Sequence, residues 1–70
     1  MELSQATAAN LRAELARQRI SGRELARRLG ENHTWVSRRL AAEQEITVDD
    51  LGRIAAVLNV PAASLLGQAA

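Results

Sequence analysis

The sequence contains no cysteine, no phenylalanine and no tyrosine, and it has a single proline. Without cysteine the chain can form neither a disulfide framework nor a thiolate metal site. It also lacks any run approaching the ~18 consecutive apolar residues that a membrane-spanning helix needs. Its N-terminus, MELSQATAANLR, has no basic start followed by an apolar core, as a secretory signal would. These absences favour a soluble cytoplasmic protein that does not contact a membrane.

The 70 residues suffice for one domain, which we expect to span residues 1–70. A chain this short buries only ~60% of the surface that its unfolded form exposes, so its core must be small. The apolar volume comes from ten Leu, three Ile, four Val and Trp35, together with 14 Ala, the best helix former. The composition therefore predicts a compact all-α fold.

Charge is unevenly distributed along the chain, although the net charge is only +1. Residues 12–39 carry eight Arg against three Glu, a local charge of +5. Residues 40–70 carry one Arg against four acidic residues, a local charge of −3. This segregation allows one half of the molecule to face a polyanion.

Apolar periodicity and capping residues predict five helices. We expect them at residues 4–18, 22–29, 33–42 and 48–58, with a short last helix in the segment PAASLL. The fourth helix should turn one apolar face inward, formed by Val48, Leu51, Ile54, Ala55 and Leu58. The connections between these helices are short, which is typical of a tight bundle.

Helix-start and helix-stop residues support these bounds. The pairs Ser21 with Glu24 and Thr47 with Asp50 have the spacing of capping boxes, and Asn32 can cap the third helix. The left-handed residues that often end helices are expected at Gly30 and Asn59. About three residues around Gly30 therefore join the second and third helices, a turn that suits two helices crossing steeply.

From Ile20 to Leu66 the sequence resembles the Cro and phage-repressor type of helix-turn-helix domain, particularly variants from actinobacteria and their phages. The resemblance rests on Leu25 and Ala26 in the second helix, Gly30 in the turn, Val36 in the third helix and the segment LGRIAAVLNVP. It implies a five-helix, lambda-repressor-like fold with a central helix-turn-helix at about residues 21–42. Ala26 would allow the two helices to cross closely.

The chain departs from the family pattern near this motif. Family members usually have apolar residues where this chain has Glu31 and Arg39, and often a glycine where it has Ala42. The following loop, usually basic, is the acidic EQE of residues 43–45, which is not expected to clamp a phosphate. If Leu40 replaces Arg39 in the core, the third helix is slightly rotated.

The structural residues expected from this pattern are Leu25, Ala26, Gly30, Trp35, Val36 and Leu40. Trp35 suits a packing role, because a small domain with no other aromatic residue gains from burying it. Its indole N–H could alternatively reach a phosphate at the edge of an interface.

In this family the third helix enters the major groove of double-stranded DNA. The resemblance therefore implies base contacts from the outward residues His33, Thr34, Ser37 and Arg38. Arg38 can present a fork to guanine, although a phosphate contact or a surface ion pair is the alternative. His33 and Ser37 could equally be ordinary solvated side chains, and a lone His in a Cys-free chain predicts no metal site.

Phosphate contacts are expected around the start of the second helix, where free N–H groups and the helix dipole attract anions. The candidates are Ser21, Gly22, Arg23, Asn32 and Arg39, the last reaching a phosphate from the flank. The capping role of Ser21 is compatible with such a contact, because the cap orders the helix end.

The function implied by the resemblance is sequence-specific DNA binding by a transcriptional regulator, a Cro-like or immunity repressor of a phage or prophage. Repression is expected over activation, because 70 residues leave no room for an effector domain. A homodimer could form through Leu65, Leu66 and the Ala-rich tail, or these leucines could simply close the core.

No cofactor or small-molecule ligand is expected, and no spaced nucleophile and base or phosphate loop indicates an enzyme. The alternative function is a helical adaptor that binds protein, such as an antitoxin or a superinfection-exclusion protein with the same fold. Binding to DNA at low salt would distinguish the two.

Overall fold

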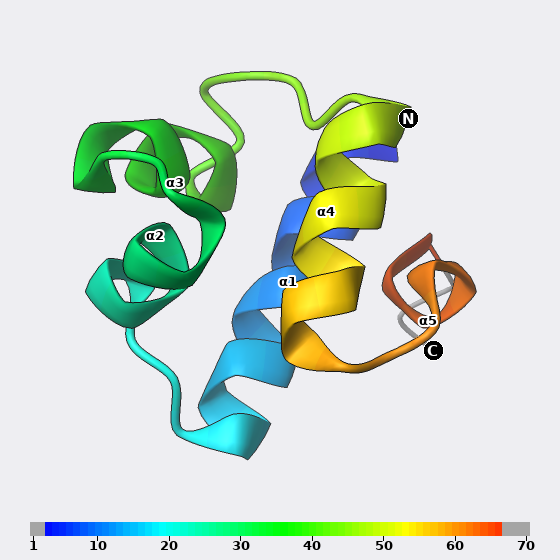
Figure 1. Cartoon of the computed structure of the whole chain (residues 1–70). Helices are drawn as coiled ribbons and strands as arrows, with labels where there is room; N and C mark the ends of the chain where they lie inside the picture. The colour runs from blue at the N-terminus through cyan, green and yellow to red at the C-terminus, as the bar shows by residue number, and fades with distance from the viewer. Residues whose placement is uncertain (1–2, 67–70) are drawn as a thin grey trace.

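The computed structural model describes residues 3–66, and all the regular structure within them is helical (Figure 1). The helices are α1 (Leu3–Gln18), α2 (Gly22–Leu29), α3 (His33–Leu40), α4 (Val48–Leu58) and α5 (Ala62–Leu66). The prediction of an all-α fold with five helices is confirmed. One expected bound was wrong: α3 ends at Leu40 rather than Ala42, because Ala42 is left-handed (φ 61°) and cannot continue the helix.

Side-chain caps fix the starts of three helices. Ser21, Asn32 and Thr47 each accept a hydrogen bond from the backbone N–H three residues later, at 3.0, 2.8 and 3.0 Å. The capping box predicted at α4 is complete, because the Asp50 carboxylate accepts the Thr47 backbone N–H at 3.1 Å. The box predicted at α2 forms only in part, since the Glu24 carboxylate bonds Arg27 and Arg28 instead.

Left-handed residues end four helices, and Arg19 (φ 59°) is the one that follows α1. Gly30 (φ 75°) and Asn59 (φ 59°) occupy the predicted positions after α2 and α4. Ala42 plays the same part after α3: the Glu43 N–H reverses to bond the Arg38 carbonyl at 2.8 Å, much as the Glu31 N–H bonds Ala26 at 3.0 Å. A residue with a Cβ therefore holds a conformation that favours glycine.

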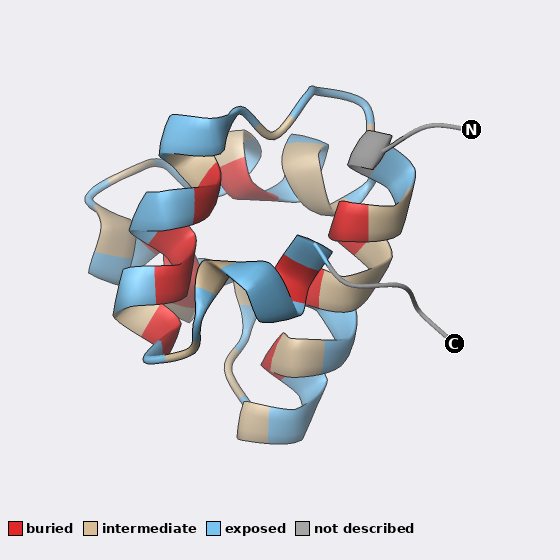
Figure 2. Cartoon of the chain, turned by 90° about the vertical axis from the view of Figure 1, so that its right-hand side faces the viewer, coloured by how far each residue is buried: buried red, intermediate tan, exposed pale blue. Residues whose placement is uncertain are grey.

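Apolar side chains from all five helices form one core (Figure 2). Its buried members are Leu11, Leu15, Leu25, Ala26, Val36, Leu51, Ile54, Ala55, Leu58 and Leu65. The predicted core residues Leu25, Ala26 and Val36 are therefore buried, and Trp35 and Leu40 pack against this core while remaining partly exposed. Burying the larger of these side chains contributes about 1.5 to 3 kcal/mol each, which is how so small a domain holds together.

The inward position expected for Val48 was wrong, because its side chain is 86% exposed. Val48 is the first residue of α4 and stands at the edge of the apolar stripe, so the neighbouring helices do not cover it. At the other end of the chain, Leu65 closes the core and Leu66 stays exposed. The Ala-rich tail after Leu66 lies outside the described residues.

The helices pack so that α2 and α3 stand together on one side of the molecule and α5 on the other (Figure 1). α2 contacts both α3 and α4, α1 contacts α3 and α5, and α4 contacts α5. No helix within residues 3–66 combines the length and the apolarity that crossing a membrane requires. The packing leaves one side of α3 facing outward.

Candidate nucleic-acid interface

α3 has two faces of different chemistry. With 3.6 residues per turn, one side carries His33, Thr34, Ser37 and Arg38, all of which are exposed. The other side carries Trp35, Val36, Arg39 and Leu40, all buried or half-buried. The outward residues are thus the four that the sequence assigned to base contacts, and in residues 3–66 no hydrogen bond or ion pair occupies their side chains.

The start of α2 lies directly against α3. A Cβ placed on Gly22 would stand 3.5 Å from His33 Nε2 and 3.6 Å from Leu40 Cδ1, so the two helices approach closely at this point. The first N–H groups of a helix have no partner within it, and here they lie beside the first residue of α3. Ser21 and Arg23 on either side of Gly22 are exposed. The structure therefore brings together the expected phosphate-binding turn and the expected reading helix.

Ion pairing divides the arginines into two groups. The ion pairs of the described chain join Arg17 to Glu14, Arg27 and Arg28 to Glu24, Arg39 to Asp50, and Arg53 to Glu31. Arg12 donates to the Leu40 carbonyl. In residues 3–66 this leaves Arg19, Arg23 and Arg38 with neither an acidic partner nor a side-chain hydrogen bond. Unneutralised positive charge therefore gathers at the start of α2 and on the outward face of α3.

The Glu24 carboxylate is held ionised by its neighbours. Hydrogen bonds from Arg27 at 2.6 Å and Arg28 at 2.8 Å lower its pKa to about 2. Glu24 thus neutralises charge on the exposed side of α2, although Arg23, one residue earlier, escapes this pairing. The pairing of Arg27 and Arg28 with Glu24 favours the view that these two arginines form a solvated face.

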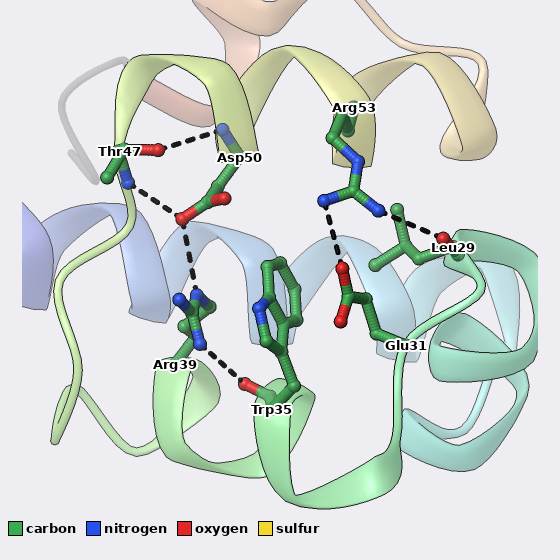
Figure 3. Close-up of polar contacts among 7 residues, drawn as sticks. All are labelled: Leu29, Glu31, Trp35, Arg39, Thr47, Asp50 and Arg53. Atoms are coloured by element: carbon green, nitrogen blue, oxygen red, sulfur yellow. Dashed lines mark hydrogen bonds and ion pairs between the residues drawn. The ribbon is translucent and has the colours of Figure 1, made fainter.

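Arg39 points toward Asp50 on α4 (Figure 3), whereas Arg38 beside it is exposed. Its Nε donates to Asp50 Oδ2 at 3.3 Å, and its Nη1 donates to the Trp35 carbonyl at 3.1 Å. The guanidinium carbon lies 3.8 Å from the centroid of the Trp35 ring. Only 14% of the Arg39 side chain is exposed. These contacts favour a structural role for Arg39 over the phosphate contact expected from the sequence.

Arg53 completes the surroundings of Trp35 from α4. It pairs with Glu31 at 3.1 Å, donates to the Leu29 carbonyl at 2.9 Å, and places its guanidinium carbon 5.6 Å from the Trp35 ring centroid. Asp50 and Arg53 were not among the site residues expected from the sequence. A signal did exist: the two departures from the family pattern, Glu31 and Arg39, carry charges opposite to those of a pair one helical turn apart on α4.

The remaining candidate, Asn32, is exposed and caps α3 through its side-chain oxygen. Trp35 packs against the core with its ring between two guanidinium groups, in keeping with the packing role expected of it. Over the described part of the chain, no three His, Cys, Asp or Glu side chains are grouped as a metal ion would need. The outward face of α3 is therefore polar and positively charged, while the contacts of Trp35 and Arg39 hold its opposite face against the rest of the protein.

Proteins of known structure that resemble this chain include a hypothetical transcription factor and a gene regulator. A helix-turn-helix family model matches residues 11–65. The hypothetical transcription factor NHTF from Neisseria is 31% identical, with a TM-score of 0.90 over 97% of this chain and 78% of that one. The clp gene regulator ClgR from C. glutamicum is 24% identical, with a TM-score of 0.89 over 94% of this chain and 86% of that one, a likeness of fold.

The same fold also occurs as part of a longer protein. FeII HppE is 31% identical and superposes with a TM-score of 0.83 over 91% of this chain, which corresponds to 34% of that protein. A comparison with curated proteins gives no match. The family match over most of the chain and the likeness to NHTF agree with the geometry of α2 and α3. The chain belongs to the Cro and phage-repressor type of helix-turn-helix family, whose members are DNA-binding transcriptional regulators.

Proposed function

We propose that this protein binds specific sites on double-stranded DNA by placing α3 in the major groove. The observation that carries the proposal is the outward face of α3, where exposed donors surround an arginine with no acidic partner in residues 3–66. Thr34 and Ser37 offer hydroxyls and Arg38 a planar fork, which match the acceptors that base edges present there. His33 stands at the start of the helix, next to the backbone of Gly22.

The start of α2 would hold a backbone phosphate. Its free N–H groups at Gly22 and Arg23 and its dipole favour an anion, and the Arg23 guanidinium adds an unpaired charge. Ser21 and Asn32 order the two helix ends that face the DNA. Arg19 joins this set, because its side chain has neither an acidic partner nor a hydrogen bond within residues 3–66.

The biological role that we propose is repression, in the manner of a Cro-like or immunity repressor of a phage or prophage, in the cytoplasm of the cell. A small domain that covers a promoter blocks polymerase without further machinery. Two copies on paired half-sites would increase both affinity and specificity, so we expect a homodimer on a palindromic site.

A second function is favoured by a different observation. An apolar pocket of about 310 Å³ opens between α1, α4 and α5. Its lining includes Ile46, Leu51 and two exposed side chains, Val48 and Leu66. Exposed apolar surface of this kind can bind protein. The alternative is therefore an adaptor, such as an antitoxin or an exclusion protein, that uses this fold to bind another protein.

Selection of bound duplexes from a random pool tests the proposal. A recovered palindromic consensus is the expected result, because it reports sequence-specific binding and half-site symmetry together. The affinity for the recovered duplex should then fall by roughly one log unit per log of salt for each phosphate contacted. Failure to bind any duplex at low salt, with tight binding to a protein instead, would replace DNA binding by the adaptor function.

A further inference from the structure

Two charged residues occupy positions where the family usually has apolar ones, and both are matched by charges on α4. Glu31, in the turn between α2 and α3, pairs with Arg53 at 3.1 Å. Arg39, on the inward face of α3, pairs with Asp50 at 3.3 Å. Because both partners lie on α4, one helix holds the turn and the reading helix together (Figure 3).

The Arg39 side chain is fixed at three points. Asp50 accepts its Nε, the Trp35 carbonyl accepts its Nη1, and its guanidinium stacks on the Trp35 ring at 3.8 Å. The side chains of Arg39 and Asp50 are each only 14% exposed. Water therefore competes little for these contacts, and the guanidinium has few other positions to adopt.

Asp50 is itself fixed by the start of α4. The oxygen that receives Arg39, Oδ2, also accepts the Thr47 backbone N–H at 3.1 Å, while the Thr47 hydroxyl accepts the Asp50 N–H at 3.0 Å. The capping box of α4 thus fixes the position of the Asp50 carboxylate, which forms the ion pair with Arg39 of α3. In residues 3–66 this is the one ion pair that joins α3 to α4.

We infer that Arg39 and Asp50 are positioning residues, which set the rotation of α3 about its own axis and so determine which outward side chains meet the bases. This inference rests on the proposed function for its DNA readout. At a helix radius of about 6 Å, a rotation of about 20° moves a side chain by roughly 2 Å, more than a base-specific hydrogen bond tolerates. Ion pairs removed from water add little net stability, whereas they can specify geometry.

The first test measures the orientation of α3 without DNA. Residual dipolar couplings of successive backbone N–H groups give both the tilt of α3 and its rotation about its own axis, relative to α1 and α4, in the unmodified protein, in Arg39→Met and in Asp50→Asn. Met keeps the length of the Arg39 stem, and Asn keeps an acceptor for the Thr47 N–H, so the second variant remains informative if the first unfolds. Arg17→Met, which breaks an exposed ion pair on α1, is the matched control.

We expect a reorientation of α3 in Arg39→Met and Asp50→Asn, and none in Arg17→Met. The double variant should change the couplings no more than Arg39→Met alone, because that substitution already removes the contact with Asp50. Unchanged α3 couplings in both single variants would overturn the inference, whether or not the protein binds DNA.

The second test compares a duplex recovered from the random pool with a random duplex. Arg39→Met and Asp50→Asn should lower the ratio of the two affinities by ~10-fold or more, with an unchanged salt slope, because register is lost while phosphate contacts remain. Equal weakening on both duplexes, with a slope smaller by about 1, would make Arg39 a phosphate contact and overturn the inference. If the unmodified protein binds no duplex, the proposed function fails, while the dipolar couplings still decide the positioning role.

Discussion

Arg38 and Arg39 are neighbours in the sequence and opposites in the structure. Arg38 extends from the outward face of α3 and has no acidic partner within residues 3–66. Arg39 stacks on Trp35 and pairs with Asp50 on α4. The eight residues of α3 therefore form two faces: one is available to a binding partner, and the other packs against the protein. The environment of an arginine, rather than its presence in a basic segment, distinguishes the two.

Replacement of Trp35 should have the largest effect, because it removes the largest side chain from the inward face of α3. Trp35→Ala leaves a cavity between α3 and α4 and strips Arg39 and Arg53 of the ring on which they stack. We expect a loss of about 3 kcal/mol in the free energy of unfolding, the lower end of the range for a large aromatic because Trp35 is partly exposed. Denaturant titration measures it. Thr34→Ala, its exposed neighbour, should change stability by less than ~0.5 kcal/mol. An equal loss of stability in Trp35→Ala and Thr34→Ala would contradict the division of α3 into a structural face and an outward face.

Removal of Arg38 should break the outward face alone. Arg38→Ala should cost ~1 to 3 kcal/mol of binding free energy on a duplex selected from a random pool, and much less on a random duplex. The melting temperature should stay unchanged, because the Arg38 side chain makes no hydrogen bond or ion pair within residues 3–66. Arg17→Ala is the control, an arginine on α1 already paired with Glu14. Equal losses on both duplexes would reduce Arg38 to a phosphate contact.

Ala42 allows the end of α3 to be examined without touching either face. Because its φ of 61° favours glycine, Ala42→Gly should raise the free energy of unfolding by roughly 0.5 to 1 kcal/mol, even though glycine costs more entropy on folding. Thermal melting gives the sign. Ala41→Gly, at the preceding residue with φ −88°, should have no such benefit. Destabilisation by Ala42→Gly would mean that α3 does not end in this turn.

Acid should weaken the inward face of α3 by protonating the Asp50 carboxylate. Burial alone would raise the pKa of Asp50, but hydrogen bonds from the Thr47 backbone and Arg39 outweigh it and lower the pKa below the ordinary value of 3.8. Since the folded state favours the carboxylate, its stabilising effect is complete above that ordinary value and is lost as the pH falls through the lower folded-state pKa.

The measurement is the free energy of unfolding at several values below about pH 5, for the unmodified protein and for Asp50→Asn. The difference in unfolding free energy between the unmodified protein and Asp50→Asn should narrow as the pH falls. A gap that stays constant would show that the Asp50 charge does not contribute. Glu24→Gln provides a comparison, because the lowered Glu24 pKa of about 2 means that the stabilising effect of this carboxylate is also lost in acid.

Local features of the fold were predictable because they are encoded within four residues of sequence. The caps at Asn32 and Thr47 and the left-handed turns at Gly30 and Asn59 need only their own neighbours. One failure was also local: Glu24 pairs with Arg27 and Arg28, three and four residues later on the same helix, and does not complete its capping box. The other failure was tertiary: Val48 is exposed because the neighbouring helices do not cover it. The position of Val48 in the apolar stripe does not reveal this.

The candidate site, too, was predictable only in part. Helical periodicity is enough to group Thr34, Ser37 and Arg38 on one face. It does not say which face turns outward, because Arg39 carries the same charge as Arg38 and breaks the apolar pattern. The answer depends on Asp50, 11 residues away, whose carboxylate makes an inward arginine favourable. Which partner a long charged side chain pairs with can therefore be learned only from the folded structure.

The most direct test of DNA binding through the outward face is to follow backbone amide signals while a duplex selected from a random pool is added. The largest changes should fall on residues 21–23 and 33–38, at the start of α2 and along α3. Residues 46–52, around the apolar pocket, should change little. The largest changes at Val48, Leu51 and Leu66 instead, or no change at any residue, would contradict the account.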